Sequence, residues 1–125
     1  MSEIGLDIVE IDRISKASES WGARFLGRIF TEGELSYCMS KKRPAQHLAA
    51  RFAAKEACMK SLGVGIGQGL RLIDIEVVSP HEGGKPLLKL HGGAKELFFR
   101  HGYRQISLSL THGTKTAAAV VIAQQ

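Results

Sequence analysis

Residues 45–62 read AQHLAARFAAKEACMKSL, an alanine-rich run that is followed directly by Gly63. The composition and the glycine stop predict one long helix over this range. On a helical wheel Leu48, Phe52 and Met59 form one apolar stripe, which is typical of a helix that packs on a core. The opposite side carries small residues, namely Ala50, Ala54, Ala57 and Ser61. Because small side chains allow close approach, we expect a second layer to pack there.

The segments on either side of this helix predict the rest of the fold. Strands are expected at 3–11, 73–79, 86–90, 105–110 and 116–123, and helices at 13–20, 24–30, 31–39 and 93–101. Asp12 is expected to cap the first helix, Trp21-Gly22 to interrupt it, and Thr31 with Glu34 to form a capping box. This order predicts a single domain, 1–125, of the α+β class, with a mostly antiparallel sheet of about five strands, one long helix and several short ones.

The strands 3–11 and 116–123 are apolar on both faces. The pattern predicts that strand 3–11 is buried on both sides. One small sheet and a few helices can hardly cover so much apolar surface within 125 residues, and an exposed apolar area of this kind usually marks an interface.

The composition excludes several classes of protein. Hydrophobic residues make up 44% of the chain and charged residues 23%, which is globular usage and excludes a fibrous protein. The longest apolar run, 116–123, is too short for a membrane span. Glu3 and Asp7 lie where a secretory signal would be basic, and two cysteines, Cys38 and Cys58, indicate reduced thiols more than a disulfide framework. We therefore expect a cytoplasmic protein.

The net charge of +5 favours an anionic partner. Nucleic acid, a phosphorylated small molecule and an acidic protein all satisfy it. The chain has neither a zinc-ligand spacing nor the aromatic signature of an RNA-recognition module. Charge alone leaves the three partners open.

Two carboxylates occupy positions that normally carry apolar residues. Asp7 interrupts a strand, where aspartate is rare, and a buried carboxylate is costly unless it is paired or bound to metal. Glu56 falls at the edge of the apolar helix stripe. An edge position or an arginine partner explains Asp7 equally well, and a surface i,i+4 pair with Lys60 is the commoner explanation for Glu56.

Three further features carry weaker signals. The run Lys41-Lys42-Arg43 is typical of a solvated loop. The glycine-rich segment 63–69 lacks the ending of a Walker A loop. His112 follows a strand, and a lone histidine there is more often structural or exposed than functional.

Together these segments resemble the holo-(acyl-carrier-protein) synthase family of short phosphopantetheinyl transferases. The stretches that match are GLDIVEIDRI at 5–14, RF at 24–25, FTEGEL at 30–35, RFAAKEA at 51–57, LGVGIG at 62–67, GKP at 84–86 and SLSLTH at 107–112. They occur in the family's order and cover nearly the whole chain. One departure is Gly113, because family members often carry a hydroxyl residue directly after the histidine.

The resemblance implies transfer of 4'-phosphopantetheine from coenzyme A to a serine of apo-acyl carrier protein, a step that serves fatty acid biosynthesis. Adenosine 3',5'-bisphosphate would be released, and Mg²⁺ would be required. Asp7 and Glu56 would bind the metal, with Glu56 and Lys60 catalytic. Coenzyme A would meet Lys42, Arg43, Arg51, Gly65 and His112, and the acidic carrier protein would meet Arg13, Arg24 and Arg28. The resemblance also implies a homotrimer, with neither nucleic acid nor membrane as a partner.

Two other readings compete with this one. A basic nucleic-acid-binding module would bind with a steep salt dependence and no need for Mg²⁺, but it gives Asp7 and Glu56 no role. A structural subunit that kept the fold and lost the activity would not need Asp7, Glu56 and Lys60 together.

Overall fold

The computed structural model describes residues 1–64, 70–80 and 84–125. Along the chain lie β1 (Ser2–Glu10), α1 (Ile11–Ile29), α2 (Glu32–Met39), α3 (Pro44–Ser61), the 3₁₀ helix η1 (Leu72–Asp74), β2 (Ile75–Val78), β3 (Leu87–Leu90), α4 (Gly92–Arg100), β4 (Gln105–His112) and β5 (Thr116–Gln124). The α+β class is confirmed. The single sheet is wrong, because the strands form two antiparallel sheets, β1-β5-β4 and β2-β3.

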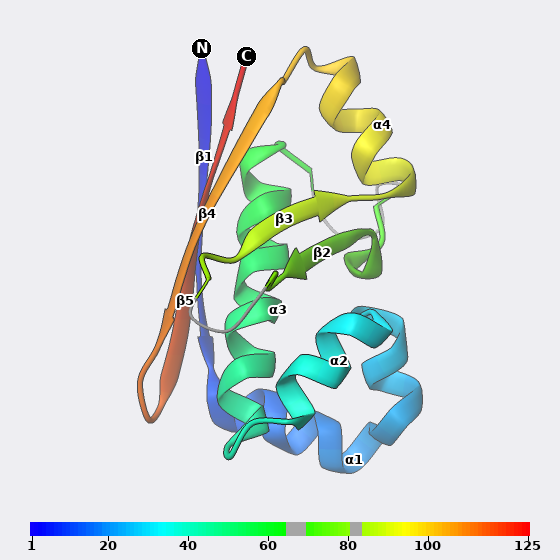
Figure 1. The fold of residues 1–125 in the computed structure, drawn as a ribbon, viewed down its shortest axis with the longest axis vertical. Helices are drawn as coiled ribbons and strands as arrows, with labels where there is room; N and C mark the ends of the chain where they lie inside the picture. Colours follow the sequence, from blue (N-terminus) through cyan, green and yellow to red (C-terminus); the bar gives the residue numbers. More distant parts are fainter. Residues whose placement is uncertain (65–69, 81–83) are drawn as a thin grey trace.

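Helix α3 lies at the centre of the molecule, between the two sheets (Figure 1). Its small-residue side faces the three-stranded sheet, and Ala50, Ala54 and Ala57 are completely buried. The helix approaches β1 closely, because a Cβ atom on Gly5 would overlap the carbonyl of Ala57 and lie 2.7 Å from the Ser61 nitrogen. The second packing layer expected from the sequence is therefore present.

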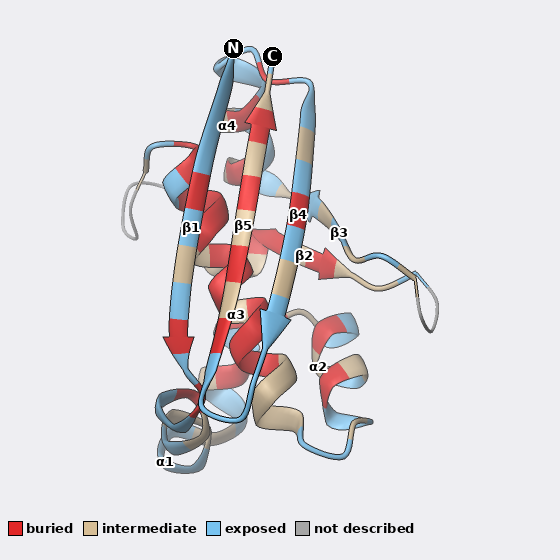
Figure 2. Ribbon diagram, turned by 90° about the vertical axis from the view of Figure 1, so that its left-hand side faces the viewer, coloured by how far each residue is buried: buried red, intermediate tan, exposed pale blue. Residues whose placement is uncertain are grey.

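The outer face of the three-stranded sheet is bare in the single chain. Ile4, Leu6 and Ile8 point outward and are 66%, 58% and 67% exposed. Figure 2 looks onto this face, and none of the described helices lies over it. The prediction that the first strand is buried on both sides is therefore wrong for one chain. Only the inward parity, which holds Gly5, Asp7 and Val9, packs on α3.

The first helix begins earlier than expected. It starts at Ile11, and its N-cap is Glu10, whose side chain makes no capping hydrogen bond, so the Asp12 cap is wrong. The expected interruption is confirmed, because Gly22 has a φ of 65° and kinks α1. The Thr31–Glu34 capping box is also confirmed.

The two cysteines are free and buried, and burial raises the pKa of Cys38 to about 11 and of Cys58 to about 12.

Candidate active site

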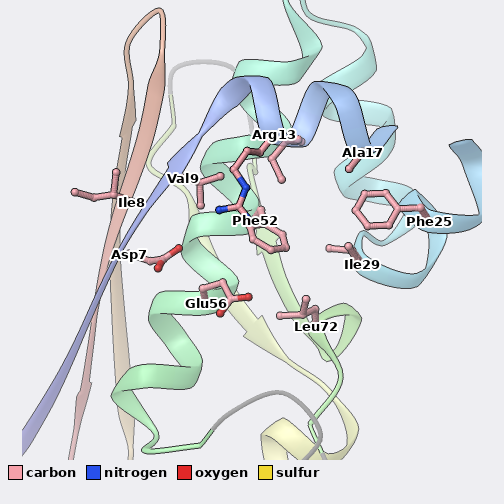
Figure 3. Close-up of a pocket in the computed structure, with 11 residues that line it drawn as sticks. Asp7, Ile8, Val9, Arg13, Ala17, Phe25, Ile29, Phe52, Glu56 and Leu72 are labelled. Atoms are coloured by element: carbon pink, nitrogen blue, oxygen red, sulfur yellow. The ribbon is translucent and has the colours of Figure 1, made fainter. Parts of the chain in front are cut away.

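A cavity of about 500 Å³ opens between β1, α1, α3 and η1. Most of its wall is apolar, formed by side chains such as Ile14, Phe25, Ile29, Phe52 and Leu72. Asp7, Arg13 and Glu56 are its charged residues, and Figure 3 shows the two carboxylates side by side on β1 and α3. Two carboxylates and an arginine thus meet in one largely apolar hollow.

Asp7 reaches this cavity because it shares the inward parity of β1 with Gly5. Its Oδ1 accepts a hydrogen bond from Lys60 Nζ at 3.1 Å, and the same ammonium donates to the Leu6 carbonyl at 3.1 Å. Lys60 therefore pairs with Asp7, and the expected surface pair with Glu56 is wrong. Tertiary contact between β1 and α3 brings the aspartate closer to Lys60 than the glutamate one turn away on the same helix.

Glu56 lies beside this pair. Burial raises the pKa of its carboxyl, the nearby Asp7 charge raises it further, and Lys60 opposes both. Because Asp7 and Glu56 lie next to each other, a cation or a proton is favoured at Glu56. Within residues 1–64, 70–80 and 84–125 no group of three or more metal-binding side chains forms. Two carboxylates suit Mg²⁺, which takes one or two carboxylates together with waters and substrate phosphates.

The arginines of α1 are divided by its kink. Arg13 lies in the first turn and lines the cavity, whereas Arg24 and Arg28 are exposed beyond Gly22 and do not line it. All three belong to one helix, and of the three only Arg13 lines the cavity.

A second basic cluster lies at the N-terminal end of α3. Lys42 and Arg43 are exposed just before the helix, and Arg51 is 3% exposed on it. The Arg51 guanidinium lies 4.2 Å from the Tyr37 ring centre, and its Nη2 donates to Ser79 Oγ at 2.9 Å. His112, at the end of β4, meets His47, with 4.9 Å between ring centres. None of these basic residues lines the carboxylate cavity, and Gly65 lies outside the described residues.

Sequence reasoning missed one buried ion pair and one histidine. Lys55 Nζ donates to Glu34 Oε1 at 2.8 Å, and both side chains are fully buried. Glu34 was already explained as the capping-box residue. Nothing in the sequence around Lys55, which directly precedes Glu56, indicated that it is buried in an ion pair. His47 was missed because only the tertiary meeting with His112 distinguishes it.

Comparison with known proteins decides the family. The model of the 4'-phosphopantetheinyl transferase superfamily matches residues 3–121. The chain belongs to this superfamily. A holo-(acyl-carrier-protein) synthase of Carboxydothermus hydrogenoformans is 48% identical over 122 residues, which span 98% of this chain and 97% of that protein. One of Syntrophus aciditrophicus is 46% identical over 118 residues, with 94% and 91% covered.

Solved structures agree with this assignment. The holo-(acyl-carrier-protein) synthase of Helicobacter pylori in complex with coenzyme A gives a TM-score of 0.84 at 36% identity, covering 97% of this chain and 99% of that one. The enzyme of Neisseria meningitidis gives 0.86 at 35% identity, covering 98% of each chain. The chain is thus a phosphopantetheinyl transferase, and the family resemblance and the enzymatic class are confirmed. None of this transferase's described helices is long and apolar enough to cross a membrane.

Proposed function

We propose that this transferase moves 4'-phosphopantetheine from coenzyme A to a serine of apo-acyl carrier protein and releases adenosine 3',5'-bisphosphate. The observation that carries the proposal is the pair Asp7 and Glu56, which line one cavity with Arg13, while Lys60 donates a hydrogen bond to Asp7. The comparisons supply the reaction class, since the relatives are named holo-(acyl-carrier-protein) synthases. Residues 1–125 act as one catalytic domain, and its free thiols suit a reducing cytoplasm.

Asp7 and Glu56 would hold Mg²⁺. The ion would offset the charge that develops on the phosphoryl oxygens. The carrier serine oxygen bonds to the phosphorus that bears pantetheine, and the bond from this phosphorus to the bridging oxygen of the diphosphate breaks. Glu56 accepts the serine proton, consistent with the raised pKa of its carboxyl. Lys60 donates hydrogen bonds to the departing phosphate, which keeps the bridging oxygen and both electrons of the broken bond.

The decisive experiment is mass spectrometry of apo-acyl carrier protein after incubation with the transferase, coenzyme A and Mg²⁺. We expect a gain of one phosphopantetheine, absent when Mg²⁺ is removed by chelation. A carrier protein that keeps its mass with all components present would contradict the proposal.

The two basic clusters serve the two anionic substrates. The three arginines of α1 are exposed to a large partner, and Arg13 lines the carboxylate cavity. Lys42 and Arg43 lie just before α3, Arg51 lies on it, and His112 at the end of β4 meets His47 of the same helix. We assign carrier protein to the first cluster and coenzyme A to the second. A net charge of +5 would steer both anions toward the enzyme.

Charge reversal should separate the clusters. Arg24→Glu is expected to raise KM for carrier protein by about tenfold and to leave KM for coenzyme A nearly unchanged, because exposed charges act mainly on association of their own partner. Lys42→Glu should do the reverse. Steady-state kinetics with each substrate varied in turn checks this, with the exposed Lys95→Glu on α4 as the control. Equal effects of both variants on both substrates would contradict the division.

The active form is proposed to be a homotrimer. The bare stripe Ile4, Leu6 and Ile8 on β1 continues into Ala118, Val120 and Ile122 on the same face of β5. An apolar face of this extent favours contact with other copies of the chain. Copies in a ring would also let the coenzyme A cluster of one chain complete the carboxylate cavity of the next.

Light scattering should give a particle near three times the 13.6 kDa chain mass, which loses specific activity on dilution. Ile4→Glu on the outer face is expected to yield monomers, whereas Leu87→Glu, at an exposed position of β3, should not. Mixing an Asp7→Asn chain with a Lys42→Glu chain should recover activity that neither has alone. A monodisperse monomer with full specific activity would contradict the trimer.

A further inference from the structure

His47 and His112 come from different elements and meet at the N-terminal half of α3. Their ring centres are 4.9 Å apart at an angle of 67°, and the Tyr37 ring lies 6.0 Å from His47 on the other side. His47 is half-buried, and His112 is exposed, so the pair opens to solvent. Next to it, Gln46 Nε2 donates to the Gly113 carbonyl at 3.2 Å and ties the β4–β5 turn to α3. The pair is therefore held in place from two elements.

The groups that act electrostatically on His47 are all basic. Lys41 precedes α3 and lies 4.5 Å from the Tyr37 ring centre, Arg51 stacks on the same ring, and His112 faces His47 from β4. No ion pair among the described residues includes any of them. A cluster of cations without a counter-charge attracts an anion.

The hydrogen bonding of Arg51 gives a second indication. Its side chain is buried, and its Nε finds no hydrogen-bond acceptor among the described residues. A buried donor without a partner is costly, and a phosphate oxygen is a matching acceptor for a guanidinium. The cluster thus combines positive charge with a guanidinium donor that has no acceptor among the described residues.

We propose that His47 is a second histidine of the coenzyme A site, and that it and His112 receive the terminal phosphomonoester and take up a proton when it binds. This inference rests on the proposed function, which assigns coenzyme A to this cluster. The phosphomonoester is the group of coenzyme A that can carry two negative charges on a single phosphorus, so it gains most from two imidazolium donors. The diphosphate is left for Lys60 and the carboxylates.

In the free enzyme His47 is able to take up a proton when coenzyme A binds. Burial lowers the pKa of its imidazole, and His112, Arg51 and Lys41 lower it further, so the ring is mostly neutral at pH 7 without ligand. A bound dianion reverses the sign of the local field and raises the pKa. Affinity for coenzyme A then increases as pH falls through the pKa that His47 has in the complex. The affinity becomes constant once the pH is below the pKa that His47 has in the free enzyme. Each unit by which binding raises the pKa gives a tenfold gain in affinity.

Calorimetric titration of the enzyme with coenzyme A tests this in buffers of different ionisation enthalpy. At about pH 6 we expect His47→Phe to bind about tenfold more weakly than the wild type and to take up fewer protons, with equal affinities at about pH 8.5. Phenylalanine keeps the aromatic packing, and the phosphate's own titration cancels between the two proteins. His101→Phe, which replaces an exposed histidine after α4, should match the wild type. Dephospho-coenzyme A should abolish the difference.

The same pH dependence in His47→Phe and the wild type would overturn the inference. Imidazole NMR resonances of the wild type give a direct measurement that does not depend on any variant, and a His47 pKa that does not rise on saturation with coenzyme A would also overturn it. Failure of the proposed function looks different, since apo-acyl carrier protein would then gain no mass at any pH. If coenzyme A binds and transfer occurs but His47 takes up no proton, only the inference about His47 is rejected and the proposed function stands.

Discussion

Asp7→Asn and Glu56→Gln are each expected to lower turnover by at least about 100-fold while the protein stays folded. Each replacement keeps the size of the side chain and removes one of the two negative charges in the cavity. Glu56→Gln also removes the proposed acceptor of the serine proton. Steady-state transfer to apo-acyl carrier protein at limiting Mg²⁺ measures the effect. Glu3→Gln, at an exposed carboxylate on the same strand as Asp7, should keep normal turnover.

The stability of Glu56→Gln gives a second check. Folding raises the pKa of the Glu56 carboxyl, so the contribution of this group to stability is full below about pH 4.5 and is lost as pH rises through the pKa in the folded state. A glutamine side chain does not titrate, so the variant does not lose this stability as pH rises. The midpoint of thermal unfolding of Glu56→Gln at pH 7 should therefore equal or exceed that of the wild type. Near-normal turnover of either variant at limiting Mg²⁺ would show that the two carboxylates do not share a metal.

Lys55→Met is expected to lower the free energy of unfolding by about 3–5 kcal/mol, because it leaves the buried Glu34 carboxylate without its cation. The ammonium also donates to the Leu72 carbonyl at 3.1 Å and to the Ile75 carbonyl at 2.5 Å, which lose their donor. Lys55 thus joins α3 to α2, η1 and the start of β2. Urea denaturation measures the loss.

Two further variants control this prediction. Lys95→Met removes an exposed lysine of α4 and should change stability by less than about 0.5 kcal/mol. Lys55→Met combined with Glu34→Gln removes both buried charges and should be more stable than Lys55→Met alone, although Glu34 also accepts hydrogen bonds from the Thr31 and Val77 backbone nitrogens. A loss below about 1 kcal/mol for Lys55→Met would contradict the importance of the pair.

Most of the fold could be predicted from sequence because its signals are local. Hydrophobic parity located the strands, and Gly63 and the Thr31–Glu34 box located helix ends within one or two residues. The division into two sheets could not be predicted, since it depends on which strands lie on which side of α3. The strand predicted at 3–11 was expected to be buried on both faces, because an apolar outer face has the same composition as a buried one.

The candidate site was partly predictable for a related reason. Asp7 and Glu56 each stood out as a carboxylate among apolar neighbours, and the structure brings them into one cavity. The prediction that Lys60 pairs with Glu56 was wrong, because the i,i+4 rule considers one helix only. Strand β1 supplies the closer carboxylate, Asp7. The Lys55–Glu34 pair is separated by 21 residues, and no spacing rule connects its members.

The close approach of β1 to α3 at Gly5 affects how a mutational scan of this chain should be read. Any side chain at Gly5 would meet the Ala57 carbonyl and push the strand away from the helix, and Asp7 would move with it. In a growth selection, Gly5 would therefore tolerate substitution as poorly as Asp7, two residues away, although Gly5 takes no part in the chemistry. Counting the yield of folded protein for each variant separates the two positions. Substitutions at Gly5 deplete soluble enzyme, whereas Asp7→Asn leaves a full yield of inactive enzyme.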